Sequence, residues 1–157
     1  MAMLENGFCT IIVNSMHMGY KIPDPTGMYA MTTKRCCDII GNLENNGIIN
    51  AAYIEAKYNK EMNAFNLNRI EPHQAYYLTE FGKASNSICY IILGVHVSRG
   101  DLRAYIFDWK DLKPFYDNKA SIHAKMLQLL PYNEIHKEKF EFTNIIHKQN
   151  LIEAGVK

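Results

Sequence analysis

The sequence predicts an α/β fold in which helices flank a central mixed sheet. Three observations lead to this fold class: helical spacing of apolar residues over 3–18, a strand–turn–strand pattern over 36–57, and a β-branched apolar run over 87–97. The expected order of elements is helix, hairpin, helix, strand, strand, helix. This order differs from a repeating βαβ unit, so parallel and antiparallel strand pairs should share one sheet.

Composition and length favour a globular protein of modest size. The chain has 157 residues, of which 48% are hydrophobic and 21% charged. We expect a single domain over residues 1–157, because domains usually hold roughly 100–200 residues. No apolar run approaches the ~20 residues of a membrane helix, and no basic segment opens a secretory signal. The sequence therefore predicts a cytoplasmic protein with no membrane partner.

Charge and cysteine content narrow the functional classes. The net charge is +1, which argues against a histone-like polybasic protein. Between residues 31 and 74 five basic and five acidic side chains balance, so a nucleic-acid enzyme with acidic groups at a metal remains compatible. The four cysteines show no CxxC spacing, which favours reduced thiols over a zinc site.

The N-terminal part predicts a helix followed by an arm. Leu4, Phe8, Ile11 and Ile12 recur at i, i+4, i+7 and i+8, which is one face of a helix over residues 3–18. Two prolines and a glycine then exclude regular structure over 21–27. We expect a short arm or stalk at about residues 19–35.

The hairpin and the helix that follows it come next. Strands are expected over 36–40 and 51–57, joined by a medium-length loop over 41–47 that is dense in asparagine and glycine. Pro72 suits the first turn of a helix, which we expect to end near Lys83.

The C-terminal half is less regular. A buried strand over 87–97 should pair with an antiparallel strand over 104–108 across a turn at 98–101. A short helix is expected over 112–116 and another over 122–130, where Pro131 ends it. The polar tail after Asn133 predicts no particular element.

Three residues carry the chemistry: Asp38, Glu55 and Lys57. Both carboxylates lie in otherwise apolar strands, where an unpartnered charge is costly to bury. A divalent cation would relieve the repulsion between them, and Lys57 lies on the same strand face as Glu55 because side chains alternate. The alternative is a solvated hairpin face with a cross-strand Lys–Asp pair, and spacing alone does not decide between them.

The residues around Asp38, Glu55 and Lys57 resemble two nuclease patterns, one general and one more specific. Asp38-Ile39-Ile40-Gly41 followed by Tyr53-Ile54-Glu55-Ala56-Lys57 is similar to the PD-(D/E)XK pattern, with Cys37 where proline is common. The continuation Ala64-Phe65-Asn66-Leu67-Asn68-Arg69-Ile70-Glu71-Pro72-His73-Gln74 resembles RecU-type Holliday-junction resolvases. Lys21-Ile22-Pro23-Asp24-Pro25 resembles the entry to the RecU stalk. The resemblance covers roughly residues 4–125, and the archaeal Hjc resolvases share its core.

This resemblance implies a restriction-endonuclease-like core and assigns roles within it. Asp38, Glu55 and the carbonyl of Ala56 would be metal ligands, and Lys57 the catalytic lysine. Gln74 at the helix start would contact a ligand water or a phosphate. The family's acidic residue on the first helix corresponds to Glu5, whose alternative role is a carboxylate favoured by the helix dipole. The implied cofactor is Mg²⁺, with Mn²⁺ able to substitute, and the reaction is hydrolysis of a phosphodiester.

Basic residues near these positions are candidate phosphate contacts. They adjoin the active strands or the helix start, and the alternative is a solvated face. The candidates for DNA binding are Lys34, Arg35, Lys60, Arg69 and His73. If the arm projects, Met28, Tyr29 and Met31 could pack against exposed bases of a four-way junction; if it folds down, they belong to the core.

The leading hypothesis is a metal-dependent, structure-selective endonuclease that cleaves four-way DNA junctions as a homodimer. A twofold dimer fits two symmetric cuts. One alternative is a PD-(D/E)XK nuclease with another DNA target, of the restriction or nicking type. Another is a non-catalytic nucleic-acid-binding domain of the same fold. Abundant Asn, Ile, Lys and Tyr suggest an A/T-rich genome, which fits a bacterial or phage-infected host cell.

Overall fold

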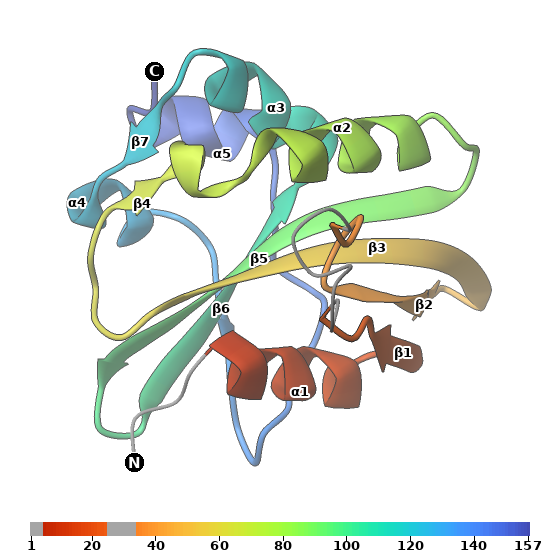
Figure 1. The fold of residues 1–157 in the computed structure, drawn as a ribbon. Coiled ribbons are helices and arrows are strands. Elements are labelled where there is room, and N and C mark those ends of the chain that lie inside the picture. Colours follow the sequence, from red (N-terminus) through yellow and green to blue (C-terminus); the bar gives the residue numbers. More distant parts are fainter. Residues whose placement is uncertain (1–4, 25–33) are drawn as a thin grey trace.

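A computed structural model describes residues 5–24 and 34–157 of the chain. Figure 1 shows a twisted sheet with helices on both of its faces. In the described part of the chain the main sheet has seven strands in the order β1-β2-β3-β5-β6-β8, with β9 also paired to β6. The predicted mixed α/β architecture, which is that of a restriction-endonuclease-like core, is confirmed. None of the described helices is long and apolar enough to cross a membrane.

The elements have the following bounds in chain order: α1 (Glu5–Ser15), β1 (Met18–Lys21), β2 (Ile39–Asn45), β3 (Ile48–Asn59), β4 (Phe65–Asn66), the 3-10 helix η2 (Leu67–Arg69), α2 (Pro72–Phe81), β5 (Ser87–Ser98), β6 (Asp101–Asp108), α3 (Trp109–Asp117), β7 (Ser121–Ile122), α4 (Ala124–Leu127), β8 (Asn133–Glu134), β9 (Ile145–Ile146) and α5 (Lys148–Glu153).

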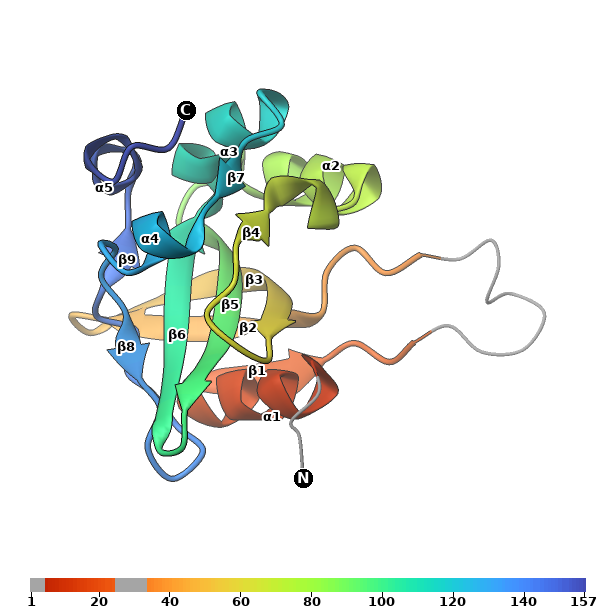
Figure 2. The same ribbon diagram turned by 90° about the vertical axis from the view of Figure 1, so that its left-hand side faces the viewer.

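The sheet is mixed because of the connection between β3 and β5. Strand β2 runs antiparallel to both β1 and β3, whereas β3 and β5 are parallel, with Glu55 opposite Ile91. A parallel pair requires a crossover, and the segment containing α2 supplies it. As a result α2 lies across the sheet next to β3 (Figures 1 and 2).

Side-chain alternation along β3 divides the two faces of the sheet. Ala52, Ile54 and Ala56 pack in the apolar cluster that contains α1. The intervening side chains Glu55 and Lys57 face the opposite layer, where α2 and α3 lie. The functional candidates on β3 therefore point toward α2 and away from α1.

Helix α1 packs on the sheet at unusually close range. Phe8 is fully buried against Gly94 of β5, where an added Cβ would lie 2.8 Å from ring carbons of Phe8. Glycine is the residue that permits this approach, so the position of α1 depends on it.

Gly94→Ala should lower the free energy of unfolding by about 1–3 kcal/mol, because the new methyl group overlaps a ring that has no free space to move into. Urea denaturation checks this. In a Phe8→Leu background the same change should cost less, since the smaller side chain leaves room. An equal cost in both backgrounds would contradict the assigned contact.

The hairpin is tighter than the sequence indicated. The expected loop over 41–47 is wrong: β2 continues to Asn45, and only Asn46 and Gly47 turn, with φ of 52° and 78°. Two left-handed residues are what a two-residue hairpin turn requires. The turn-rich segment forms a strand because residues 41–45 pair with β3, and Gly41 and Asn42 also pair with β1.

Further expectations differ from the structure. The helix expected over 3–18 ends at Ser15, and β1 (Met18–Lys21) pairs with β2 where the arm was expected to begin. The helix expected over 122–130 is only the four-residue α4, because Ile122 pairs instead with Phe65 in the small β4–β7 sheet. Asp38 lies directly before β2 rather than within it. The unassigned tail supplies β8, β9 and α5, whose strand pairings are with distant β6.

The described ends of the arm meet at its base. Residues 22–24 and 34–35 have no regular structure, and Arg35 Nη1 lies 3.1 Å from the carbonyl of Ile22. The expected placement of Met28, Tyr29 and Met31 falls outside the described residues.

Candidate active site

The two strands of the hairpin bring Asp38 and Glu55 together. The N–H of Asp38 donates to the carbonyl of Ile54 at 3.1 Å, which fixes Asp38 beside the middle of β3. Its side-chain Oδ2 accepts from the N–H of Ala56 at 2.9 Å. Because Ala56 follows Glu55, the two carboxyl groups face the same space next to α2.

Helix α2 contributes Gln74 to this space. Its Oε1 accepts from the N–H of Glu71 at 2.8 Å, which forms one half of the capping box at the start of α2. Its Nε2 donates to Oε1 of Glu55 at 2.6 Å. A helix cap therefore sets the position of Gln74 relative to the carboxylate.

The carboxylate of Glu55 is only partly satisfied. Its Oε1 accepts hydrogen bonds from Lys57 Nζ at 3.1 Å and from Gln74 Nε2. Its Oε2 is buried and has no hydrogen-bond partner among the described residues. Burial, followed by the nearby charge of Asp38, raises the pKa of Glu55 to about 8, and Lys57 lowers it in part.

These donors fit a divalent cation. Asp38 and Glu55 have exposed fractions of 4% and 1%, and buried carboxylates of this kind need a partner or a metal. The unpartnered Glu55 Oε2 supplies one free oxygen, and hard cations such as Mg²⁺ prefer carboxylate and carbonyl oxygens. The backbone carbonyl of Ala56, a residue whose N–H already binds Asp38, is a further candidate oxygen ligand.

The site opens into a cleft of about 310 Å³. The side chains that line it are Asp24, Lys34, Arg35, Cys37, Asp38, Glu55, Glu71, His73 and Gln74. Three of the five expected DNA contacts, Lys34, Arg35 and His73, thus lie at the cleft. Lys60 is exposed just beyond the end of β3 and does not line it.

Glu5 at the start of α1 lies near the same group of charges. Burial raises its pKa, and the charges that act on it are those of Lys57, Asp38 and Arg69. Arg69 Nη2 is 3.9 Å from its carboxylate. The structure therefore places Glu5 close to the site without a direct contact to Asp38 or Glu55.

Arg69 is engaged by the protein itself. Its guanidinium donates to Asn59 Oδ1 at 2.6 Å and to the carbonyl of Tyr58 at 3.1 Å, and it lies over the ring of Phe65. These contacts connect the end of β3 to the segment that leads to α2. The sequence placed Arg69 near the site but gave no signal for this bracing position.

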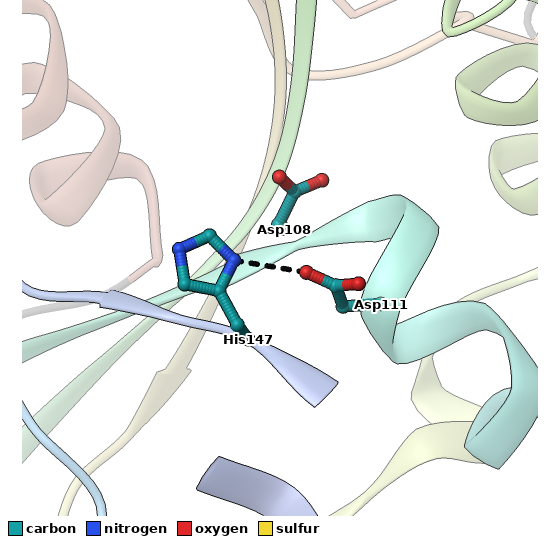
Figure 3. Close-up of side chains that lie close together, drawn as sticks. All are labelled: Asp108, Asp111 and His147. Carbon is teal, nitrogen blue, oxygen red and sulfur yellow. Dashed lines mark hydrogen bonds and ion pairs between the residues drawn. The ribbon is translucent and has the colours of Figure 1, made fainter. Parts of the chain in front are cut away.

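A second group of potential ligands lies outside the cleft. Figure 3 shows Asp108, Asp111 and His147, with His147 Nδ1 2.9 Å from Asp111 Oδ2. Helix capping accounts for much of this group: Asp108 caps α3 by accepting from the N–H of Lys110, and His147 is the N-cap of α5. The contact joins α5 to α3, and the sequence gave no sign of it because the partners are 36 positions apart.

A comparison with protein families identifies the family of this chain. Residues 27–153 match the family model of recombination protein U. The chain belongs to the RecU family. This is a family of Holliday-junction resolvases, which are nucleases that act on four-way DNA junctions. No curated protein matches the chain.

The RecU match extends beyond the segments on which the resemblance was based. It continues past residue 125 to residue 153, so it includes β8, β9 and all of α5. The short C-terminal elements that the sequence left unassigned thus belong to the family region.

Raising the pH should destabilise this RecU-family protein in the absence of a cation, through Glu55. The pKa of Glu55 is about 8 in the folded protein, above the ordinary 4.5, so the folded state holds its proton more tightly than the unfolded state. The resulting stabilisation is fully present below pH 4.5 and is lost as the pH rises through 8.

Urea denaturation in EDTA at several pH values measures this effect. The Glu55→Gln variant keeps the shape of the side chain but does not titrate, so it should lack this part of the pH dependence. Identical pH profiles for the two proteins would show that Glu55 is not the group responsible.

Proposed function

We propose that the protein is a divalent-metal-dependent endonuclease that cleaves four-way DNA junctions by phosphodiester hydrolysis, with Mg²⁺ as its cation and Mn²⁺ able to replace it. The observation that carries this proposal is the buried, unpartnered Oε2 of Glu55 beside Asp38 and Lys57. RecU-family membership supports the choice of substrate.

Asp38, Glu55 and the carbonyl of Ala56 are the residues that would hold the cation. When bound, it supplies Lewis-acid stabilisation of the phosphate and activates the attacking water. Lys57 Nζ, held 3.1 Å from Glu55, is positioned to orient that water and to assist its deprotonation. Gln74, fixed by the α2 cap, keeps Glu55 in place for these roles.

DNA contacts and assembly complete the proposal. Lys34 and His73 at the cleft, and Lys60, which is exposed beyond the end of β3, are proposed to bind phosphates, while Glu5 contributes negative charge near Lys57. One domain per subunit holds one such site. Two symmetric cuts in a junction therefore require two chains, and we propose a homodimer in a bacterial or phage-infected cell.

Asp38→Asn and Glu55→Gln should each reduce junction cleavage in Mg²⁺ by at least about 1,000-fold, because each removes a charge that holds the cation. Each substitution also removes one negative charge from the lining of the cleft, so binding of a labelled four-way junction should persist in both variants. Gel assays of cleavage and of binding measure the two properties separately. Asp111→Asn, which removes a carboxylate outside the cleft, is the matched control and should cleave normally.

The choice of DNA substrate separates the remaining alternatives. Paired symmetric cuts confined to the junction support the resolvase. Equal cutting of linear duplex indicates a PD-(D/E)XK nuclease of another type. Binding without cutting, with Mg²⁺ or with EDTA, indicates a non-catalytic domain and overturns the proposal.

Lys34→Gln and Lys60→Gln should each weaken junction binding and reduce the slope of log K against log salt by about 1, because each loses one phosphate contact. Titrations at several salt concentrations provide the slope. Lys113→Gln on α3, where the lysine pairs with Asp117 at 2.7 Å, is the control. If it lowers the slope equally, the effect reflects net charge and not contacts in the cleft.

A further inference from the structure

Arg35 joins the base of the arm to the candidate metal site. Its Nη2 lies 3.0 Å from Oδ1 of Asp38. Its Nη1 lies 3.0 Å from Oδ1 of Asp24 and donates to the carbonyl of Ile22 at 3.1 Å. One guanidinium thus connects the segment that leads into the arm, at Ile22 and Asp24, to a carboxylate of the site. Figure 2 shows the described parts of the two arm segments leaving the same side of the sheet.

We propose that Arg35 and the divalent cation compete for Oδ1 of Asp38, and that the displaced guanidinium arm becomes a phosphate-binding group for the DNA. This inference rests on the proposed function and adds a coupling between cation binding and DNA binding. It assigns Arg35 a role that changes with the occupancy of the site.

The two oxygens of Asp38 differ in how firmly they are held. Oδ2 accepts from the backbone N–H of Ala56, which is part of the central strand β3 and cannot move away. Oδ1 is held by a side chain, Arg35, that is itself attached to the arm. The oxygen available for exchange is therefore Oδ1.

Charge makes simultaneous occupancy unfavourable. Asp38 is almost fully buried, so a cation on Oδ1 and a guanidinium at 3.0 Å would repel each other with little screening by solvent. Arg35 can yield at a modest cost, because its side chain is 24% exposed and Nη1 keeps Asp24 and Ile22 as partners.

The position of Arg35 suits a phosphate once Nη2 is released. Arg35 lines the cleft together with Lys34 and His73, where the backbone of a bound DNA strand would run. A guanidinium presents several donors in a planar fork that matches phosphate oxygens. Arg35 would thus exchange one anionic partner for another on cation binding.

A fixed structural role for Arg35 predicts the opposite behaviour. If Arg35 only holds Asp38 in position, its removal should loosen the site and weaken cation binding. If Arg35 competes, its removal should free Oδ1 and tighten cation binding. The sign of the change in cation affinity decides between the two.

The test is titration of Mn²⁺ and Mg²⁺ into the DNA-free protein by isothermal calorimetry. Arg35→Gln, whose side chain lacks the positive charge, should bind both cations about fivefold to tenfold more tightly than the wild type. Arg35→Lys keeps the charge but not the fork, and should show a smaller change in the same direction. Lys113→Gln removes a cation outside the cleft that pairs with Asp117, and should stay within about twofold of the wild type.

Junction binding by fluorescence anisotropy tests the second half of the inference. In EDTA, Arg35→Gln should bind the junction like the wild type, because Arg35 is then engaged with Asp38. In Ca²⁺, which binds similar oxygen ligands, the variant should bind more weakly, with a salt slope reduced by about 1. Equal loss in EDTA and Ca²⁺ would overturn the coupling.

The result that overturns the competition is a cation affinity of Arg35→Gln that is unchanged or weaker, in a variant whose circular dichroism spectrum matches the wild type. If that variant fails to fold, Arg35→Lys decides on the same criterion. This failure is distinguishable from failure of the proposed function. In the first case the wild type still binds cation and cleaves junctions, and in the second it does neither.

Discussion

The structure depends on the burial of two carboxyl groups side by side. Asp38 and Glu55 lie between β2, β3 and α2, where burial and the nearby charge of Asp38 raise the pKa of Glu55. Each neighbouring element supplies a partial compensation: a backbone N–H from β3, an ammonium from Lys57, an amide from Gln74 and a guanidinium from Arg35. The compensation remains incomplete at Oε2 of Glu55. A core that holds such a pair needs a rigid frame around it.

The sheet provides that frame. Strand β3 is twelve residues long and is paired along most of its length on both sides, so its side-chain directions are fixed. On the opposite face of the sheet, the ring of Phe8 from α1 packs directly on Gly94. This close contact restricts movement of the sheet beneath the site. The parallel β3–β5 pair requires the crossover that brings the start of α2 to Glu55. Fold and site are thus set by the same strand pairing.

What the sequence predicted follows from local rules. Alternation along a strand was enough to place Glu55 and Lys57 on one face, and proline at the first helical turn predicted the start of α2 near Gln74. The hairpin loop was predicted wrongly because a turn-rich segment can still form a strand when it pairs with a neighbouring strand, as residues 41–45 do with β3. The partners of Arg69, the β4–β7 pairing and the link between Asp111 and His147 are contacts between distant segments, which residue spacing does not encode.

The charge of the cleft differs from the charge of the whole chain. The whole chain is nearly neutral, at +1, yet the described residues that line the cleft carry four carboxyl groups and two permanently cationic side chains, those of Lys34 and Arg35. Without a cation this lining opposes the approach of a phosphate. A divalent ion held by the proposed ligands would add two positive charges to the cleft and, in the proposed exchange, would also free the guanidinium of Arg35. Affinity for DNA at the cleft should therefore arise largely from cation binding, so a nearly neutral protein does not need a basic surface to act on DNA.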